Sequence, residues 1–119
     1  MTPATDPRRR FGDRGEDLAA AFFIANGFEV VCRNWSCRMG EIDLVCAKDG
    51  VTHFVEVKTR RTTDFGHPEE AITRKKLEHL SRAIEEYLRQ HPVTGYQADA
   101  LAISLTDGSP SFHYVEQIL

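Results

Sequence analysis

Two acidic residues and a lysine stand inside segments that otherwise have the composition of buried β-strands. Asp43 lies within Gly-Glu-Ile-Asp-Leu-Val at 40–45, and Glu56 and Lys58 lie within Phe-Val-Glu-Val-Lys at 54–58. A buried carboxylate without a partner is strongly unfavourable, so each acid must be paired or hold a metal. Side chains two residues apart in a strand share a face, so Glu56 and Lys58 should point the same way. This pattern predicts a site for a hard divalent cation and an anionic substrate.

Hydrolysis of a phosphodiester needs an activated water, stabilisation of the phosphate charge, and a proton or cation for the leaving oxygen. One or two Mg²⁺ or Mn²⁺ ions held by carboxylate and carbonyl oxygens meet much of this need. We expect Asp43 and Glu56 to be metal ligands, with the backbone carbonyl of Val57 as a further ligand. Lys58 would orient the attacking water or stabilise the developing charge. These residues predict a metal-dependent nuclease.

A Glu-x-Lys pattern is a weak indication by itself, because a solvated ion pair on an exposed strand has the same sequence. The residues around both acids are apolar, which favours a buried site instead. They are Phe54, Val55 and Val57 around Glu56, and Ile42 and Leu44 around Asp43. A third acid, Glu16, lies beside Gly15 in a predicted helix and is a further candidate for this site.

Basic residues follow the strand that carries Lys58 and begin the next predicted helix. They are Arg60, Arg61, Arg74, Lys75 and Lys76. Guanidinium and ammonium groups bind phosphate oxygens, whereas at a helix N-terminus they oppose the helix dipole. We therefore expect these residues to contact nucleic acid. For Arg60 and Arg61 a solvated loop is the alternative.

The length of 119 residues predicts one domain, with 10–119 folded and 1–9 a mobile segment. A formal net charge of −3 argues against a general basic nucleic-acid binder, although the clustering of the basic residues weakens that objection. No apolar run is long enough to cross a membrane and no secretory signal is visible, so we expect a cytoplasmic protein. Three cysteines leave one unpaired, which argues against a disulfide framework.

Hydrophobic periodicity predicts an α/β fold in which helices flank a mixed sheet. The expected order is helix, three strands, helix and two strands, at 11–26, 28–35, 40–47, 51–59, 74–90, 96–105 and 112–118. Asp49-Gly50 predicts a tight hairpin that places Asp43 near Glu56 in space. Thr73 is the expected N-cap of the second long helix, a single helical turn is expected at 69–72, and 107–110 should form a turn.

The combined motifs resemble the YraN family of small bacterial proteins. They are Gly15-Glu16, the segments 40–45 and 54–60, the segments 65–66 and 68–71, the basic helix start at 74–76, and the strand that carries Asp99. That family is similar in fold to restriction endonucleases and archaeal Holliday-junction resolvases, the PD-(D/E)xK nucleases. Ile42 stands where the nominal superfamily motif has proline, and the YraN pattern has Ile or a similar residue there.

The resemblance implies a restriction-endonuclease-like fold. It also implies that Asp43 and Glu56 are metal ligands, that Lys58 is the catalytic lysine, and that Glu16 is an accessory acid near the metal. The expected substrate is DNA, including branched or structured forms, and symmetric dimerisation is an open question. Two alternatives stay open: a nucleic-acid-binding module without catalysis, and a protein-interaction domain whose charges form surface ion pairs.

Overall fold

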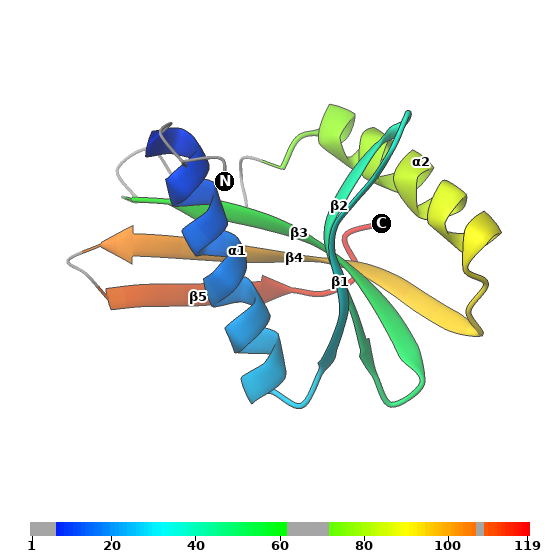
Figure 1. Cartoon of the computed structure of the whole chain (residues 1–119), viewed down its shortest axis with the longest axis horizontal. Coiled ribbons are helices and arrows are strands. Elements are labelled where there is room, and N and C mark those ends of the chain that lie inside the picture. The colour runs from blue at the N-terminus through cyan, green and yellow to red at the C-terminus, as the bar shows by residue number, and fades with distance from the viewer. Residues whose placement is uncertain (1–6, 62–71, 107–108) are drawn as a thin grey trace, which may run out of the picture.

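The computed structural model describes the backbone of residues 7–61, 72–106 and 109–119, which form a five-stranded mixed sheet with a helix on each face (Figure 1). The elements are α1 (Pro7–Ala25), β1 (Glu29–Cys37), β2 (Gly40–Lys48), β3 (Val51–Arg60), α2 (Arg74–Gln90), β4 (Gly95–Thr106) and β5 (Ser109–Val115). The predicted α/β class and the predicted order of the elements are confirmed.

The strands lie in the sheet in their sequence order, β1-β2-β3-β4-β5. Every neighbouring pair is antiparallel except β3 and β4, which are parallel and joined through α2. The hairpin between β2 and β3 turns at Asp49 and Gly50, whose φ angles of 51° and 80° belong to the tight turn that matches strand twist. The predicted antiparallel pairing of these two strands is confirmed.

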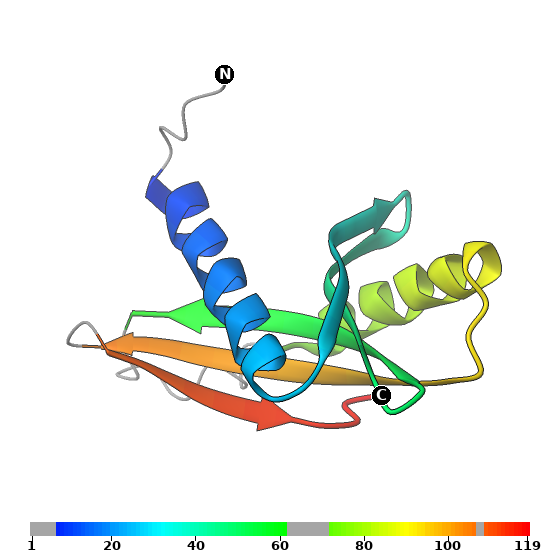
Figure 2. The same cartoon turned by 60° about the horizontal axis from the view of Figure 1, so that its bottom comes forward.

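Alternation along β3 divides the core between the two faces of the sheet. Val55 faces α1 and Phe54 faces α2, so the even-numbered residues of this strand point toward α2. The α1 face comprises Ala19, Phe23, Leu44, Cys46, Val55, Leu101 and Ile103. The α2 face comprises Ile42, Val45, Phe54, Leu80, Ala83, Ile84, Tyr87 and Ala98. Figure 2 shows the β1–β2 hairpin rising out of the sheet toward the side of α2.

The first helix begins at Pro7, four residues before the expected start, and therefore includes the end of the segment expected to be mobile. Proline is favoured at the first helical position, where its missing N–H has no helical partner, and the three arginines that follow are good helix formers. Residues 1–6 lie outside the described residues. Helix α2 begins as predicted, since the hydroxyl of Thr73 accepts a hydrogen bond from the Lys76 backbone N–H at 3.2 Å.

The last strand was predicted at 112–118 and instead spans Ser109–Val115. Pro110 is tolerated in it because β5 is an edge strand that needs no donor on its outer side. After the strand the chain turns at Gln117, with φ of 56°, and the Ile118 N–H donates to the Ala98 carbonyl. Of the predicted turns, residues 69–71 and 107–108 lie outside the described residues. No helix in the described ranges is both long and apolar enough to cross a membrane.

Helix α1 lies very close to β3 at Gly15. A Cβ atom there would overlap the Thr59 hydroxyl and lie 3.2 Å from two carbons of that side chain. We therefore predict that Gly15→Ala destabilises the protein by about 1–3 kcal/mol through overpacking, despite the better helix propensity of alanine. Urea denaturation followed by circular dichroism measures the change in free energy of unfolding.

Gly95 provides the matched control, because a Cβ atom there would meet nothing within 4 Å. Gly95→Ala should leave stability nearly unchanged, and Thr59→Ala should recover part of the loss caused by Gly15→Ala. Equal effects of the two glycine substitutions would contradict the close contact.

Candidate functional site

The β2–β3 ladder ends where the two central acids face each other. The last paired residues are Leu44 and Val55, and extending this register by one position brings Asp43 opposite Glu56. The Val57 backbone N–H donates to the Asp43 carboxylate at 2.8 Å, in place of a strand-to-strand backbone bond. The strands separate at this point, and the sequence prediction that Asp43 and Glu56 are spatial neighbours agrees with this geometry.

A cavity of about 210 Å³ lies at this fork, on the face of the sheet that α2 covers. Its lining residues come from the start of β2, the middle of β3 and the first turns of α2. They are Gly40, Glu41, Asp43, Glu56, Lys76, His79 and Leu80. Helix and hairpin meet closely here, because a Cβ atom at Gly40 would stand 3.1 Å from the His79 carbonyl oxygen. With φ of 152°, Gly40 also holds a backbone conformation that favours glycine.

The two acids form a region of negative charge that the neighbouring lysines offset only in part. Burial raises the pKa of Asp43 to about 7, the Glu56 carboxylate adds to the rise, and the hydrogen bond from Val57 opposes it. Burial also raises the pKa of Glu56, against the opposing charges of Lys76 and Lys58. Both acids thus hold their protons more tightly than free carboxyl groups do, and a bound cation would relieve the same unfavourable charge.

Lys58 lies beside Glu56 as predicted, but its nearest cationic neighbour is Lys76 from α2. The Lys76 side chain lowers the pKa of Lys58, burial lowers it further, and Glu56 acts in the opposite direction. The sequence prediction that Lys76 contacts nucleic acid stays a prediction, and the structure places this side chain in the lining of the cavity. Its spacing of four residues before the buried Leu80 is the signal that could have shown this, because such residues share a helix face.

Glu16 is not gathered with the other two acids. Its carboxylate accepts a hydrogen bond from the Asn34 side chain at 2.6 Å and lies 3.9 Å from the Arg33 guanidinium. It belongs to α1, on the opposite face of the sheet from the cavity, although its charge is among the causes that raise the pKa of Asp43. Within the described residues, no group of three or more His, Cys, Asp or Glu side chains is arranged to hold a metal ion.

The remaining predicted basic residues lie at the end of β3 and in the first turn of α2. Arg60 is close enough to Lys58 for its charge to lower the pKa of that lysine. Arg61, Arg74 and Lys75 are exposed, the first after the end of β3 and the others in the first turn of α2. The sequence interpretation also missed two lining residues, His79 and Glu41. The charge of Glu41 raises the pKa of both Asp43 and Glu56.

Comparison with known proteins assigns the chain to a family. Residues 15–103 match the model of "Uncharacterised protein family UPF0102". The chain belongs to this family. A UPF0102 protein of Syntrophomonas wolfei is 41% identical over 109 residues, covering 90% of this chain and 95% of the relative.

Further UPF0102 proteins cover much of the chain. The one from Herpetosiphon aurantiacus is 36% identical over 119 residues, covering 95% of this chain and 96% of the relative. The one from Clavibacter michiganensis is 48% identical over 81 residues, covering 68% and 69%. The resemblance to the YraN family is thereby confirmed, and the names of these UPF0102 relatives state no activity.

The raised pKa of Asp43 makes stability depend on pH in a defined direction. The ordinary value is 3.8 and the folded value is about 7, so the folded state holds the proton more tightly and stability falls as pH rises between these values. Asp43→Asn keeps an oxygen acceptor for Val57 and removes the ionisation. We predict that this substitution stabilises the protein by roughly 2 kcal/mol more at pH 8 than at pH 5.

Thermal and urea denaturation across this pH range measure the effect. Glu78→Gln, on the exposed side of α2, is the control and should shift stability equally at both pH values. If the difference in free energy of unfolding between Asp43→Asn and the unmodified protein were the same at every pH, the pKa of Asp43 would not be raised in the folded state.

Proposed function

We propose that this UPF0102 protein is a metal-dependent nuclease that hydrolyses phosphodiester bonds in DNA. The observation that carries the proposal is the fork itself, where the Asp43 carboxylate faces Glu56 in a cavity next to Lys58 and Lys76. A mixed sheet with a helix on each face and its acids at a strand fork also supports the finer proposal of a restriction-endonuclease-like fold. A shared fold alone does not imply a shared activity, so the proposal rests on the residues of the site.

The donor set fits a hard divalent cation. Asp43 and Glu56 offer carboxylate oxygens in a confined space, and Mg²⁺ and Mn²⁺ accept such ligands while keeping bound waters. We propose that these two residues hold the ion, with the Val57 carbonyl as a further contributor. Glu16, which is engaged by Asn34 and Arg33 on the other face of the sheet, is not part of this proposed ligand set. When bound, the cation would neutralise charge on the phosphate and make a water ligand more acidic.

The residues around the acids have separate proposed roles. Lys58, whose pKa is lowered, is suited to hold a water molecule and to exchange a proton with it. Lys76 brings a second positive charge to the side of the cavity formed by α2, where a phosphate would meet it. Arg60, Arg61, Arg74 and Lys75 would contact flanking phosphates and position the strand.

A second candidate function is a nucleic-acid-binding protein without catalysis. The observation that favours it is the engagement of Glu16 by Asn34 and Arg33, which keeps this expected accessory acid away from Asp43 and Glu56. In that case the lysines and arginines would bind phosphates, and the acids would repel the nucleic-acid strand and so limit where it can lie.

We predict divalent-metal-dependent cleavage of supercoiled plasmid or branched DNA that is lost on substitution of the site. Asp43→Asn, Glu56→Gln and Lys58→Met should each reduce the rate by at least about a hundredfold, since each group supplies ligand or electrostatic stabilisation. Glu78→Gln should keep full activity. Activity that survives all three site substitutions belongs to a contaminant, and DNA binding without cleavage selects the non-catalytic candidate.

Metal binding is tested separately from activity. We predict that millimolar Mn²⁺ raises the melting temperature of the unmodified protein, because a ligand that binds the folded state stabilises it. The rise should vanish with EDTA and in the double substitution Asp43→Asn/Glu56→Gln, and it should persist in Glu78→Gln. Identical shifts in all variants would locate the ion elsewhere.

A further inference from the structure

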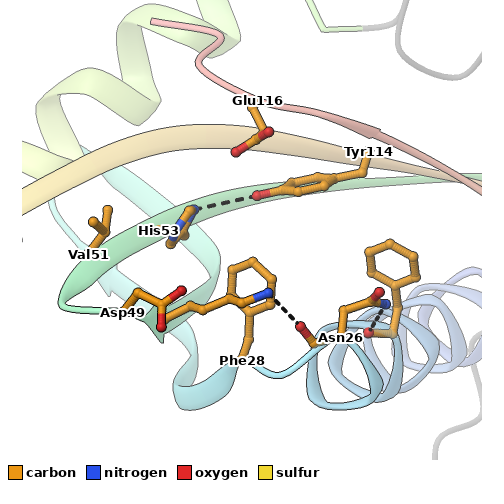
Figure 3. Close-up of a pocket in the computed structure, with 9 residues that line it drawn as sticks. Asn26, Phe28, Asp49, Val51, His53, Tyr114 and Glu116 are labelled. Carbon is orange, nitrogen blue, oxygen red and sulfur yellow. Dashed lines mark hydrogen bonds between the residues drawn. The ribbon is translucent and has the colours of Figure 1, made fainter.

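A second cavity, of about 400 Å³, lies on the α1 face of the sheet next to the β2–β3 turn (Figure 3). Its size lies within the range of small-molecule sites. Aromatic rings of Phe22, Phe28 and Tyr114 form much of its wall. The Asp43–Glu56 cavity opens on the other face of the same sheet, so the two cavities are distinct.

His53 is held at the base of this cavity by a fully buried acid. Its Nδ1 lies 2.7 Å from the Asp99 carboxylate, which also accepts hydrogen bonds from the Tyr114 hydroxyl at 2.5 Å and the Gln97 amide at 2.9 Å. A fourth donor is the Gln117 backbone N–H at 2.9 Å. A carboxylate with this many donors is an acceptor, which assigns a ring proton to Nδ1, and in the neutral imidazole Nε2 then carries the lone pair.

The second ring nitrogen of His53 faces the cavity without a partner. The residue is only 6% exposed and lines the cavity, and within the described part of the chain no hydrogen bond joins Nε2 to another group. No fully buried side-chain nitrogen or oxygen in those residues lacks a partner, so Nε2 is not sealed in the core, and the cavity that His53 lines is the space next to its ring. A purely structural role for His53 would explain its hydrogen bond to Asp99, but it would not explain why Nε2 has no partner.

The other polar groups of the cavity are mostly acceptors. The carboxylates of Asp49 and Glu116 line it, and the Gln97 amide donates to Glu116 at 3.1 Å. One cation balances them in part: the Lys48 ammonium donates to the Asn26 carbonyl at 2.9 Å and lies 5.0 Å from the centre of the Phe28 ring. Two of its three donor hydrogens are left for another partner.

We propose that this cavity binds an amino-substituted nitrogen heterocycle, the chemistry of adenine and cytosine. A flat ring suits the aromatic walls, its exocyclic amine can donate to His53 Nε2 and a carboxylate, and its ring nitrogen can accept from Lys48. A ligand with acceptors alone would leave the carboxylates and His53 unpaired, and an aliphatic amine would be repelled by Lys48 without using the rings. The source is either a free nucleoside or an unpaired base of a nucleic-acid strand.

The test uses adenosine and purine riboside, which differ only in the exocyclic amine. Adenosine should cause saturable NMR shifts of the amides at 48–53 and of the His53 Nε2 resonance, and it should bind about tenfold more tightly than purine riboside. Asp43→Asn should bind adenosine unchanged, so failure of the proposed nuclease and failure of this site give different results. Absence of shifts, or equal affinity for both ligands, overturns the proposal.

Substitutions in the lining test whether adenosine binds in the cavity without disturbing the fold. Lys48→Met, at an exposed position, and Glu116→Gln leave the His53–Asp99 pair intact and should each weaken adenosine binding several-fold, while Glu78→Gln should not. Retention of full affinity in both cavity variants overturns the proposal. A single-stranded adenine oligonucleotide provides the last comparison. Tighter binding than adenosine, with the same Lys48 dependence, identifies a strand base as the source, and equal or weaker binding identifies the free nucleoside.

Discussion

The hydrogen bond from the Val57 N–H to the Asp43 carboxylate is the contact on which the candidate site depends. A side chain takes the place of a backbone acceptor, so the β2–β3 ladder stops after Leu44 and Val55 and the strands diverge. The divergence makes room for the cavity and keeps the carboxylates of Asp43 and Glu56 facing each other. An ordinary continued ladder would have filled the same space with backbone.

Helix α2 supplies the remaining wall of the cavity at the fork. Its N-cap at Thr73 sets the start of the helix, and its buried stripe from Leu80 to Tyr87 fixes its rotation over the sheet. Lys76, one turn before that stripe, is thereby turned toward Glu56 and Lys58. The balance of charge at the site is therefore a property of tertiary packing. Two lysines from different elements partly offset two partly buried acids, in a chain whose formal net charge is −3.

The same strand serves both faces of the sheet. Glu56 points to the α2 side, whereas His53, three residues earlier, lies with Phe28 and Tyr114 on the α1 side. Both cavities therefore rest on β3, with a layer of apolar side chains on each face of the sheet. Other UPF0102 proteins align over most of this chain, so each cavity can be compared residue by residue in those relatives.

Local patterns in the sequence determined the order of the elements, the Asp49-Gly50 hairpin, the Thr73 cap and the neighbourhood of Asp43 and Glu56. Each follows from residues close in the chain, or from a tight turn that sets register, and such signals need no knowledge of packing. Only the tertiary structure determined the partners of Glu16, the position of Lys76 in the cavity lining, and the contacts within the His53–Asp99–Tyr114 cluster. His53 and Asp99 are 46 positions apart and Asn34 and Glu16 are 18 apart, and no periodicity in the sequence encodes which face or partner such distant side chains find.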